Sequence, residues 1–362
     1  MADAQTIEDA LASVEYPLLR RTIGELGMVD SVEKGRLGAA TVSLRVPFVG
    51  HPSDAQMQEA IQQALAEVGG VRSVKVDVRE MTDSEQAEAM GKVTAKVPGV
   101  VAPGSQTRVI SVSSGKGGVG KSSITSNLAV ALAARGHSVG VMDADVWGFS
   151  IPGMLGAGPA PVLIHQSIIP PEAYGVKVMS MDYFVGDDKA VIWRGPMLHK
   201  AMEQFINDVF WDAPDFLLID TPPGTGDVAI SLSQFLPRAQ MLLVTTPQPT
   251  AQKVARRAGL MADEVDQELM GVVENMAWFT GDDGKRYEIF GAGGGQALAD
   301  DLGVPLLGSI PLLPAMREGA DGGMPIRAID PEGEVAQAFD ALAEAVEAAK
   351  PRVRTHPDLV IR

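Results

Sequence analysis

The stretch Gly115-Lys116-Gly117-Gly118-Val119-Gly120-Lys121-Ser122 decides the fold of this 362-residue chain. It fits the phosphate-binding pattern G-x-x-x-x-G-K-[ST] at every fixed position. The apolar run 108–112 that precedes it predicts a buried strand, and the segment 122–134 that follows it predicts a helix. An ordinary glycine-rich turn needs neither the lysine nor the serine, whereas a loop between a strand and a helix is the setting in which this pattern binds phosphate. The sequence therefore predicts a nucleotide-binding P-loop.

Each type of residue in this loop has a chemical reason to face a phosphate chain. Glycines allow a tight turn and bring backbone N–H groups onto phosphate oxygens, and the following helix adds partial positive charge at its N-terminus. Lys121 supplies a point charge for the β- and γ-phosphates, and the Ser122 hydroxyl is suited to ligate Mg²⁺. Lys116 is a second cation in the loop, and it is either a solvated surface charge or a residue that reaches a phosphate across a dimer interface.

Three aspartates follow predicted strands and are candidates for magnesium binding and catalysis. Asp143 and Asp145 come after the strand 138–142, and Asp220 follows the apolar run 216–219. Ligands of parallel sheets bind at this carboxyl edge. We expect Asp143 and Asp220 near the magnesium ion, and Asp145 orienting or deprotonating the attacking water. The alternative for Asp143 and Asp145 is a pair of solvated loop carboxylates.

The order of predicted elements indicates an α/β fold. From residue 107 onward, short apolar segments alternate with helical patterns, which predicts a mostly parallel P-loop NTPase sheet covered by helices. The expected strands of this sheet are 108–112, 138–142, 176–181, 216–219, 240–245, 269–273 and 306–310.

A small α+β domain is expected before this sheet, over residues 1–85. Its clearest elements are the amphipathic helix 54–68 and the alternating strand 74–78. Small residues, prolines and glycines then predict a linker with room for one short helix. The remaining expected boundaries are a linker at 86–106, the P-loop domain at 107–350 and a tail at 351–362.

The composition argues against several classes of function. The formal net charge is −16, so we expect neither nucleic acid nor a membrane surface as a partner. The chain has no cysteine, which excludes disulfides and thiolate ligands for zinc or an iron–sulfur cluster. No signal segment is visible at the N-terminus, and no apolar run approaches membrane-spanning length. The expected location is cytoplasmic.

Beyond the general P-loop pattern, the chain resembles one class of dimeric ATPases. Its loop is similar to the deviant Walker A motif of the MinD/ParA/nitrogenase-iron-protein class. Within this class, residues 107–330 resemble the Mrp/ApbC family of iron–sulfur cluster carrier ATPases, and residues 1–85 are similar to the metal–sulfur-cluster assembly domain often fused to it. The segments that carry the resemblance are Trp193-Arg194-Gly195-Pro196-Met197, Ile219-Asp220-Thr221-Pro222-Pro223-Gly224-Thr225-Gly226-Asp227, Gly271-Val272-Val273-Glu274-Asn275-Met276, Phe290-Gly291 and Leu307-Gly308-Ser309-Ile310-Pro311.

The resemblance implies roles for individual residues. It implies that Lys116 contacts the nucleotide across a homodimer, that Lys121 acts on the phosphates and that Asp145 activates water. It also implies that Asn275 reads the adenine ring, for which a helix or loop cap is the alternative. Ser122 and Asp220 would serve Mg²⁺ directly or through water. The expected ATP-binding residues are Gly115, Gly117, Gly118, Val119, Gly120, Lys121, Ser122, Ser123 and Asn275, and those expected at the metal are Ser122, Asp143 and Asp220.

The chain departs from this family where its members carry cysteines. The family usually has a C-x-x-C pair shortly after the Glu-Asn-Met segment, and two such pairs hold a bridging cluster at the dimer interface. Here residues 277–290 contain no thiol, and Gly281 to Gly284 predict a polar hairpin turn. In the small domain, His51-Pro52 stands where the family usually has a cysteine before a proline, and one lone histidine makes no metal site. We therefore do not expect cluster binding in the family's manner.

The function that the resemblance implies is an ATP-hydrolysing homodimer of the cluster-carrier family. It would act in iron–sulfur protein assembly without cysteine ligands, with iron–sulfur apoproteins or assembly factors as partners. One alternative is a nucleotide-gated, partner-binding switch of the MinD/ParA type without cluster transfer. A small-molecule kinase or amide ligase is another, although no acceptor-binding groups are evident for it. The acidic polar face of the predicted helix 332–349 favours core packing over membrane binding.

Overall fold

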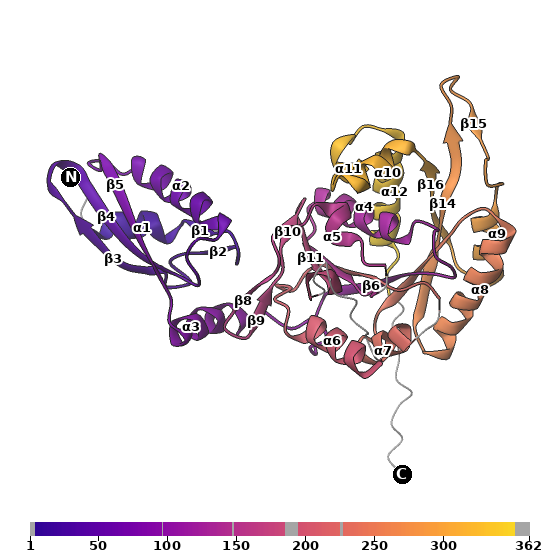
Figure 1. Cartoon of the computed structure of the whole chain (residues 1–362), viewed down its shortest axis with the longest axis horizontal. Helices are drawn as coiled ribbons and strands as arrows, with labels where there is room; N and C mark the ends of the chain where they lie inside the picture. Colours follow the sequence, from indigo (N-terminus) through magenta and orange to yellow (C-terminus); the bar gives the residue numbers. More distant parts are fainter. Residues whose placement is uncertain (1–3, 96, 147, 185–194, 225–226, 352–362) are drawn as a thin grey trace, which may run out of the picture. The chain divides into compact units, whose positions relative to one another are not determined.

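The computed structural model describes residues 4–95, 97–146, 148–184, 195–224 and 227–351. The chain divides into two compact units, each with its own core (Figure 1). Unit 1 comprises Met1–Pro98, Val162–Ile169 and Asp208–Asp212, and unit 2 comprises Gly99–Pro161, Pro170–Asn207 and Ala213–Arg362. The division does not follow a single cut in the sequence, because two short segments between residues 162 and 212 belong to unit 1.

Unit 1 is a three-stranded sheet packed against helices. Strand β4 pairs with β3 in the antiparallel and with β5 in the parallel sense. Alternate residues of β4 are buried and meet a stripe of apolar residues on α2, as the period-two and helical patterns predict. Its elements are α1 (Ala4–Ala12), β1 (Glu15–Tyr16), β2 (Arg21–Thr22), β3 (Val29–Lys34), β4 (Ala39–Val46), α2 (Pro52–Ala66), β5 (Ser73–Glu80), α3 (Asp83–Thr94), β8 (Val162–Ile164) and β9 (Ser167–Ile169).

The core of unit 1 includes side chains from far along the sequence. Ile164, Ile169 and Phe210 are buried in the same apolar cluster as the residues of α2 and β4. The backbone N–H of Phe210 donates to the carbonyl of Ile168 at 2.8 Å. Arg21 forms a two-fold ion pair with Asp212, with its shorter contact at 2.6 Å. Unit 1 is therefore completed by the β8–β9 hairpin and the segment 208–212.

The expected boundary after residue 85 differs from the structure. Helix α3 runs through this point, and Ala89, Met90 and Val93 bury one of its faces in the core of unit 1. Its start is fixed by a capping box, in which Thr82 and Glu85 each accept a hydrogen bond from the other's backbone. The polar segment that suggested a linker is thus the first turn of a helix, and unit 1 extends to residue 98.

Unit 2 is an α/β domain built on a nine-stranded sheet of order β10-β11-β7-β12-β6-β13-β14-β15, with β16 beside β14. Neighbouring strands along β11-β7-β12-β6-β13-β14-β16 pair in the parallel sense. Strand β10 pairs with β11, and β15 with β14, in the antiparallel sense. Its strands are β6 (Arg108–Ser114), β7 (Val139–Asp143), β10 (Glu172–Ala173), β11 (Val176–Ser180), β12 (Phe216–Asp220), β13 (Gln240–Thr245), β14 (Glu268–Thr280), β15 (Arg286–Tyr287) and β16 (Leu306–Leu312). The expected mostly parallel sheet is confirmed.

Helices cover both faces of this sheet, which explains why its strands are apolar on both sides. On one face, α4 and α12 pack on residues such as Leu242 and Val244; on the other, α8 and α9 pack on Leu243 and Val272. Figure 1 shows α6 and α7 on the side opposite α4. The helices are α4 (Lys121–Ala134), α5 (Ile151–Leu155), α6 (Gly195–Asn207), α7 (Asp227–Phe235), α8 (Pro249–Glu264), α9 (Gly294–Leu302), α10 (Pro314–Asp321), α11 (Ile326–Ile329) and α12 (Glu334–Ala348).

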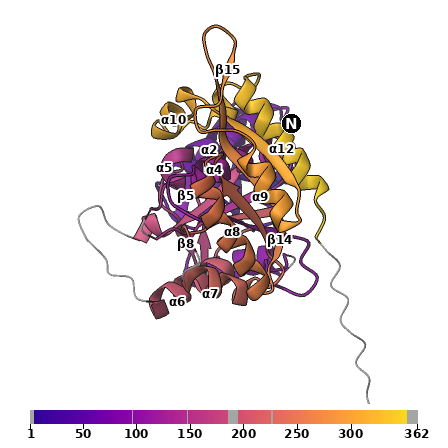
Figure 2. The same ribbon diagram turned by 90° about the vertical axis from the view of Figure 1, so that its right-hand side faces the viewer.

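One strand is longer than the sequence suggested. We expected a strand over 269–273, but β14 continues to Thr280 and forms with β15 a hairpin that projects from the rest of unit 2 (Figures 1 and 2). We call residues 277–290 the arm. The predicted polar turn is present, since the backbone N–H of Gly284 donates to the carbonyl of Gly281 at 2.9 Å. The polar pair Glu274-Asn275 interrupts the apolar run of the strand, although both residues are buried, and the apolar residues 276–279 continue it.

Candidate nucleotide-binding site

The glycines of the predicted P-loop are required for two different reasons. Gly118 and Gly120 have φ values of +79° and +80°, which L side chains rarely adopt. A Cβ on Gly115 would lie 2.3 Å from the backbone nitrogen of Ala255, so this glycine allows helix α8 to approach the loop. A Cβ on Gly117 would meet no described atom within 4 Å. The loop is therefore fixed at its base and open on the side of Gly117 and Gly118.

Four side chains converge where this loop enters helix α4. Asp220, at the end of β12, is fully buried and accepts hydrogen bonds from Ser122 Oγ at 2.6 Å and Thr125 Oγ1 at 2.9 Å. Lys121 Nζ lies 2.7 Å from the same carboxylate. Strand β12 pairs directly with β6, which leads into the loop, and this pairing brings residues about 100 positions apart together. Ser122 and Asp220, both expected at the metal, are thus in direct contact, and their magnesium role stays a prediction.

The contacts of Lys121 and Ser122 fit a magnesium nucleotide. Lys121 is buried. Its ion pair with Asp220 lacks hydrogen-bond geometry, so its ammonium has no hydrogen-bond acceptor among the described residues. A buried ammonium with free donors next to an open glycine loop is suited to phosphate oxygens. The hydroxyl of Ser122 and the carboxylate of Asp220 are hard oxygen ligands of the kind that Mg²⁺ prefers.

Asp143, the last residue of β7, and Asp145, two residues beyond it, occupy different environments. Asp145 Oδ2 lies 3.9 Å from Lys121 Nζ, and its side chain is buried at the mouth of the loop. Asp143 is fully buried and directs its carboxylate to the start of α5, where the backbone N–H groups of Ser150 and Ile151 donate to it at 3.0 and 3.2 Å. The structure therefore brings Asp145 to Lys121, and it places Asp143 with α5. A magnesium role for Asp143 stays a prediction.

The environment of Asp143 changes its acidity. Burial, together with the charge of the neighbouring Asp220, raises the pKa of Asp143 to about 7, against the hydrogen bonds from three backbone N–H groups. Asp143 and Asp220 are register partners on adjacent strands, which explains their mutual effect. Two carboxylates held side by side out of water cannot both ionise cheaply. The charge of this edge of the sheet therefore depends on pH and on the cations present.

The remaining predicted residues lie around the loop. The amide of Asn275 is buried and donates from Nδ2 to the carbonyl of Val119 at 2.8 Å, so it braces the loop. Its role at an adenine ring stays a prediction. The Ser123 carbonyl accepts from Asn127 Nδ2 at 3.0 Å within α4. Lys116 is half-buried, and its ammonium forms no ion pair with the residues that the structure describes.

The loop after Asp220 is tied to the strand that carries the P-loop. The Thr221 hydroxyl donates to the carbonyl of Val112 at 2.9 Å, and it also contacts the Ser113 hydroxyl at 2.9 Å. The backbone N–H of Gly224 donates to the carbonyl of Ser114 at 2.9 Å. Residues 225 and 226, which belong to the resemblance, lie outside the described residues. A change at Asp220 is therefore linked by short contacts to the base of the P-loop.

Sequence reasoning missed Thr125 and Thr221, which complete this site. Thr125 lies one helical turn after Lys121, on a buried face of α4 that is otherwise mostly apolar. A polar residue at this spacing from Lys121 is the feature of the sequence that could have indicated it. Thr221 follows Asp220 directly, within the segment that carries the family resemblance. The partners of Asp143 lie on other elements, and no spacing in the sequence indicates them.

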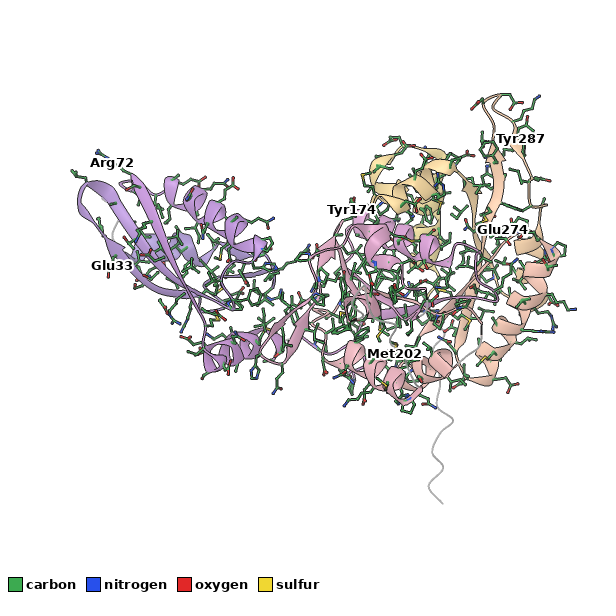
Figure 3. The ribbon with its side chains drawn as sticks, in the orientation of Figure 1. Glu33, Arg72, Tyr174, Met202, Glu274 and Tyr287 are labelled. Atoms are coloured by element: carbon green, nitrogen blue, oxygen red, sulfur yellow. The ribbon has the colours of Figure 1, made fainter. Side chains whose placement is uncertain are left out.

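The arm has a polar cluster in the region where the family usually carries its C-x-x-C pair. Trp278 Nε1, Thr280 Oγ1 and Arg286 Nη2 donate to the Glu334 carboxylate at 3.1, 2.9 and 3.1 Å. The guanidinium of Arg286 lies 4.3 Å from the centre of the Trp278 ring. Tyr287 is exposed on the arm, whereas Glu274 lies towards the helices and accepts from the backbone N–H of Gly295 (Figure 3). These side chains close the hairpin and offer no soft ligand.

Other histidines and acids do not replace the missing thiols. His51 Nδ1 accepts from the backbone N–H of Ser53 and so caps helix α2, and His199 contacts Ser231 and Phe235. Within the described part of the chain, no group of three or more histidines or carboxylates is arranged to hold a metal. In the same residues, no helix is both long and apolar enough to cross a lipid bilayer.

Comparison with known proteins agrees with this geometry. The family model of the NUBPL iron-transfer P-loop NTPases matches residues 105–347, and that of an iron–sulfur cluster assembly protein matches residues 4–78. An iron–sulfur cluster carrier protein of Mycobacterium tuberculosis is 44% identical over 350 residues, which are 94% of this chain and 92% of the relative.

Two solved structures show the same fold for unit 2. A nucleotide-binding protein of Archaeoglobus fulgidus in complex with ADP has a TM-score of 0.55 and 32% identity, covering 65% of this chain and 93% of its own. The septum site-determining protein MinD of Pyrococcus horikoshii, complexed with Mg-ADP, has a TM-score of 0.52 and 27% identity, covering 67% and 96%. The match over most of the chain, the P-loop geometry and the paired Ser122 and Asp220 lead to one conclusion: the chain belongs to the NUBPL iron-transfer P-loop NTPase family, among whose members are iron–sulfur cluster carrier proteins.

Proposed function

We propose that this protein binds ATP with Mg²⁺, hydrolyses it and uses the reaction in iron–sulfur protein assembly. The observation that carries the proposal is the convergence of Lys121, Ser122 and Asp220 under an open glycine loop, with Asp145 beside them. The names of the carrier relatives support the assembly role. ATP is abundant in the cytoplasm, and we propose that location.

The residues of the site would divide the work between them. The backbone N–H groups of the loop and Lys121 would hold the phosphates and balance charge that develops on them. Ser122 and Asp220 would hold Mg²⁺, which supplies charge neutralisation and orients the phosphate oxygens when bound. Asp145 would orient the attacking water and accept its proton, because its buried carboxylate lies 3.9 Å from the ammonium of Lys121.

The test is Mg²⁺-dependent phosphate release from ATP by the wild type and by Lys121→Ala. We expect the variant to lose at least about 100-fold in turnover, since the transferred phosphate loses a buried donor. Lys75→Ala, which removes an exposed lysine from unit 1, is the matched control and should keep wild-type turnover. Equal turnover by Lys121→Ala and the wild type would refute the assignment of the site.

We further propose that two copies associate through ATP, with Lys116 reaching the nucleotide of the second copy. The half-buried position of Lys116 and its lack of an ion pair among the described residues support this role. Light scattering with and without ATP should show dimer formation by the wild type and much less by Lys116→Ala. The same association by both proteins would remove the role in trans.

The cargo needs ligands that this chain does not provide. Iron–sulfur clusters are held by thiolates, and the chain has no cysteine. We therefore propose that a partner's thiolates hold the cluster while this protein supplies the nucleotide-driven step. Anaerobic incubation with iron and sulfide should give the protein no stable chromophore, and stoichiometric iron–sulfur absorption by the purified chain would contradict this part of the proposal.

A further inference from the structure

Three neighbouring strands of unit 2 end in buried polar residues that lie side by side. Ser180 at the end of β11 is the register partner of Asp143 on β7, and Asp143 is the register partner of Asp220 on β12. All three are fully buried. A buried hydroxyl needs a partner, because its desolvation is otherwise uncompensated. The partner of Ser180 therefore indicates why a serine stands at this edge.

The hydroxyl of Ser180 both donates and accepts a hydrogen bond. Ser180 Oγ donates to Asp143 Oδ2 at 3.3 Å, and it accepts from the backbone N–H of Asp182 at 3.1 Å. The other donors to Asp143 are backbone N–H groups. Among the described residues, Ser180 is thus the one whose side chain donates a hydrogen bond to this carboxylate. It adds no charge to a site that already holds several carboxylates.

Asp143 in turn fixes the turn that carries Asp145. Its Oδ1 accepts from the backbone N–H of Asp145 at 3.1 Å, and its Oδ2 accepts from Ser150 and Ile151. These bonds hold the backbone of Asp145 and the start of α5 on one carboxylate. The side chain of Asp145 then lies 3.9 Å from Lys121 Nζ. A rotation of the Asp143 carboxylate would therefore move the backbone from which Asp145 projects.

We propose that Ser180 is a positioning residue for ATP hydrolysis, which holds Asp143 and through it the turn that presents Asp145. This inference rests on the proposed function, because the placement of Asp145 matters for rate only if it acts on a nucleotide. The Ser180 hydroxyl bonds to Asp143 and Asp182 and not to Lys121 or Ser122, so its effect is indirect. Small displacements of a catalytic group are costly in rate.

Three variants separate positioning from simple stability. Ser180→Ala removes the hydroxyl and leaves Asp143 with its three backbone donors, so the fold should persist. Ser180→Thr keeps a hydroxyl at the same place. The control is Ser111→Ala, which removes another buried strand serine that contacts Gln240 and Gln267 away from the site. All three are made in the full-length protein.

We expect Ser180→Ala to lower kcat about 10-fold, the low end of the effect of residues that orient a reacting group. KM and the Kd of a non-hydrolysable ATP analogue should stay within about twofold of the wild type, because the loop and Lys121 are untouched. Ser180→Thr should restore most of kcat, and Ser111→Ala should keep it. An unchanged kcat in Ser180→Ala, or an equal loss in Ser111→Ala, would overturn the inference.

Amide hydrogen exchange provides a readout that does not depend on hydrolysis. The N–H groups of Asp145, Ser150 and Ile151 should exchange faster in Ser180→Ala than in the wild type and in Ser111→Ala. If the wild type did not hydrolyse ATP, the proposed function would fail, and unchanged exchange at these amides would separately show that Ser180 does not hold the turn. Faster exchange with normal kcat would confine Ser180 to a structural role and overturn positioning.

Discussion

The carboxyl edge of the sheet and helix α12 both use one carboxylate to gather several donors, but in opposite surroundings. At the sheet edge, Asp220 meets Lys121, Ser122 and Thr125, and its side chain is 0% exposed. At the two ends of α12, Glu347 meets Arg135 and His137 with 24% of its side chain exposed, and Glu334 meets the arm with 41% exposed. All three carboxylates thus accept from several donors, but Asp220 is buried whereas Glu347 and Glu334 are partly exposed.

This difference decides what each cluster contributes. Exposed ion pairs exchange water contacts for protein contacts at little net gain, so they fix geometry without adding much stability. A buried group of charges is costly to expose and costly to break, because a charge without its partner remains out of water. The sheet edge is therefore expected to respond strongly to substitution and pH, and the ends of α12 weakly.

The largest effect should come from Lys121→Ala, measured as stability rather than turnover. The change leaves Asp143 and Asp220 adjacent, buried and without the lysine, and we expect a loss of about 3–5 kcal/mol in unfolding free energy at pH 8. The loss should be smaller at pH 5.5, where one of the two carboxylates is protonated. Urea denaturation at both pH values measures it, and a loss no larger than that of Glu334→Ala would break the comparison.

The second effect is the pH dependence carried by Asp143. Its folded pKa is raised to about 7 from 3.8, so its contribution is fully present below pH 3.8 and is lost as pH rises to about 7. Without Mg²⁺ and nucleotide, the unfolding free energy of the wild type should decrease relative to that of Asp143→Asn by on the order of 2–4 kcal/mol between pH 4 and pH 8. Parallel pH profiles for the two proteins would contradict this.

A smaller effect of opposite sign is expected at the C-terminal end of α12. The hydrogen bond from Arg135 lowers the pKa of Glu347 to about 2, with help from His137 and against burial. Its contribution is present above about pH 4.5 and is lost as pH falls towards 2. Glu347→Gln should cost about 0.5–1 kcal/mol at pH 7, discounted for solvent exposure, and nothing near pH 2. Thermal unfolding against pH tests it.

The smallest effect is expected at the N-terminal end of α12. Glu334→Ala removes the acceptor shared by Trp278, Thr280 and Arg286, and it should cost about 0.2–0.5 kcal/mol, with a further decrease in added salt. ATP turnover should not change, while amide exchange in residues 277–287 should rise. A large stability loss here would show that exposure is not what separates the two regions.

The sequence predicted the centre of unit 2 well, for a physical reason. Strands buried on both faces are continuous apolar runs, and the P-loop and Asp220 sit at their ends, where motif and pattern agree. The pairing of Ser122 with Asp220 follows from this alone. The carboxyl ends of adjacent parallel strands meet, so the position of a residue along its strand also gives its place in the site.

Features that depend on contacts between distant segments were not predictable in this way. The partners of Asp143 come from α5 and β11, and nothing local in Ser150 or Ser180 indicates that they meet one carboxylate. In β14 the polar pair Glu274-Asn275 interrupts the apolar run, so the expected strand stopped before the apolar residues 276–279 that continue it. Helix α3 begins in a polar segment, and only the Thr82–Glu85 capping box marks it.

The way in which unit 1 is closed has a consequence for how such proteins arise. The assembly-domain match ends at residue 78, yet Ile164, Ile169 and Phe210 fill the core of the same unit from within the sequence of the P-loop domain. A gene rearrangement that moved only the first 98 codons would transfer a module with an open apolar side. We therefore expect the N-terminal segment and the P-loop domain to be inherited together. Exchange of unit 1 between relatives should succeed only when the segments 162–169 and 208–212 are transferred with residues 1–98.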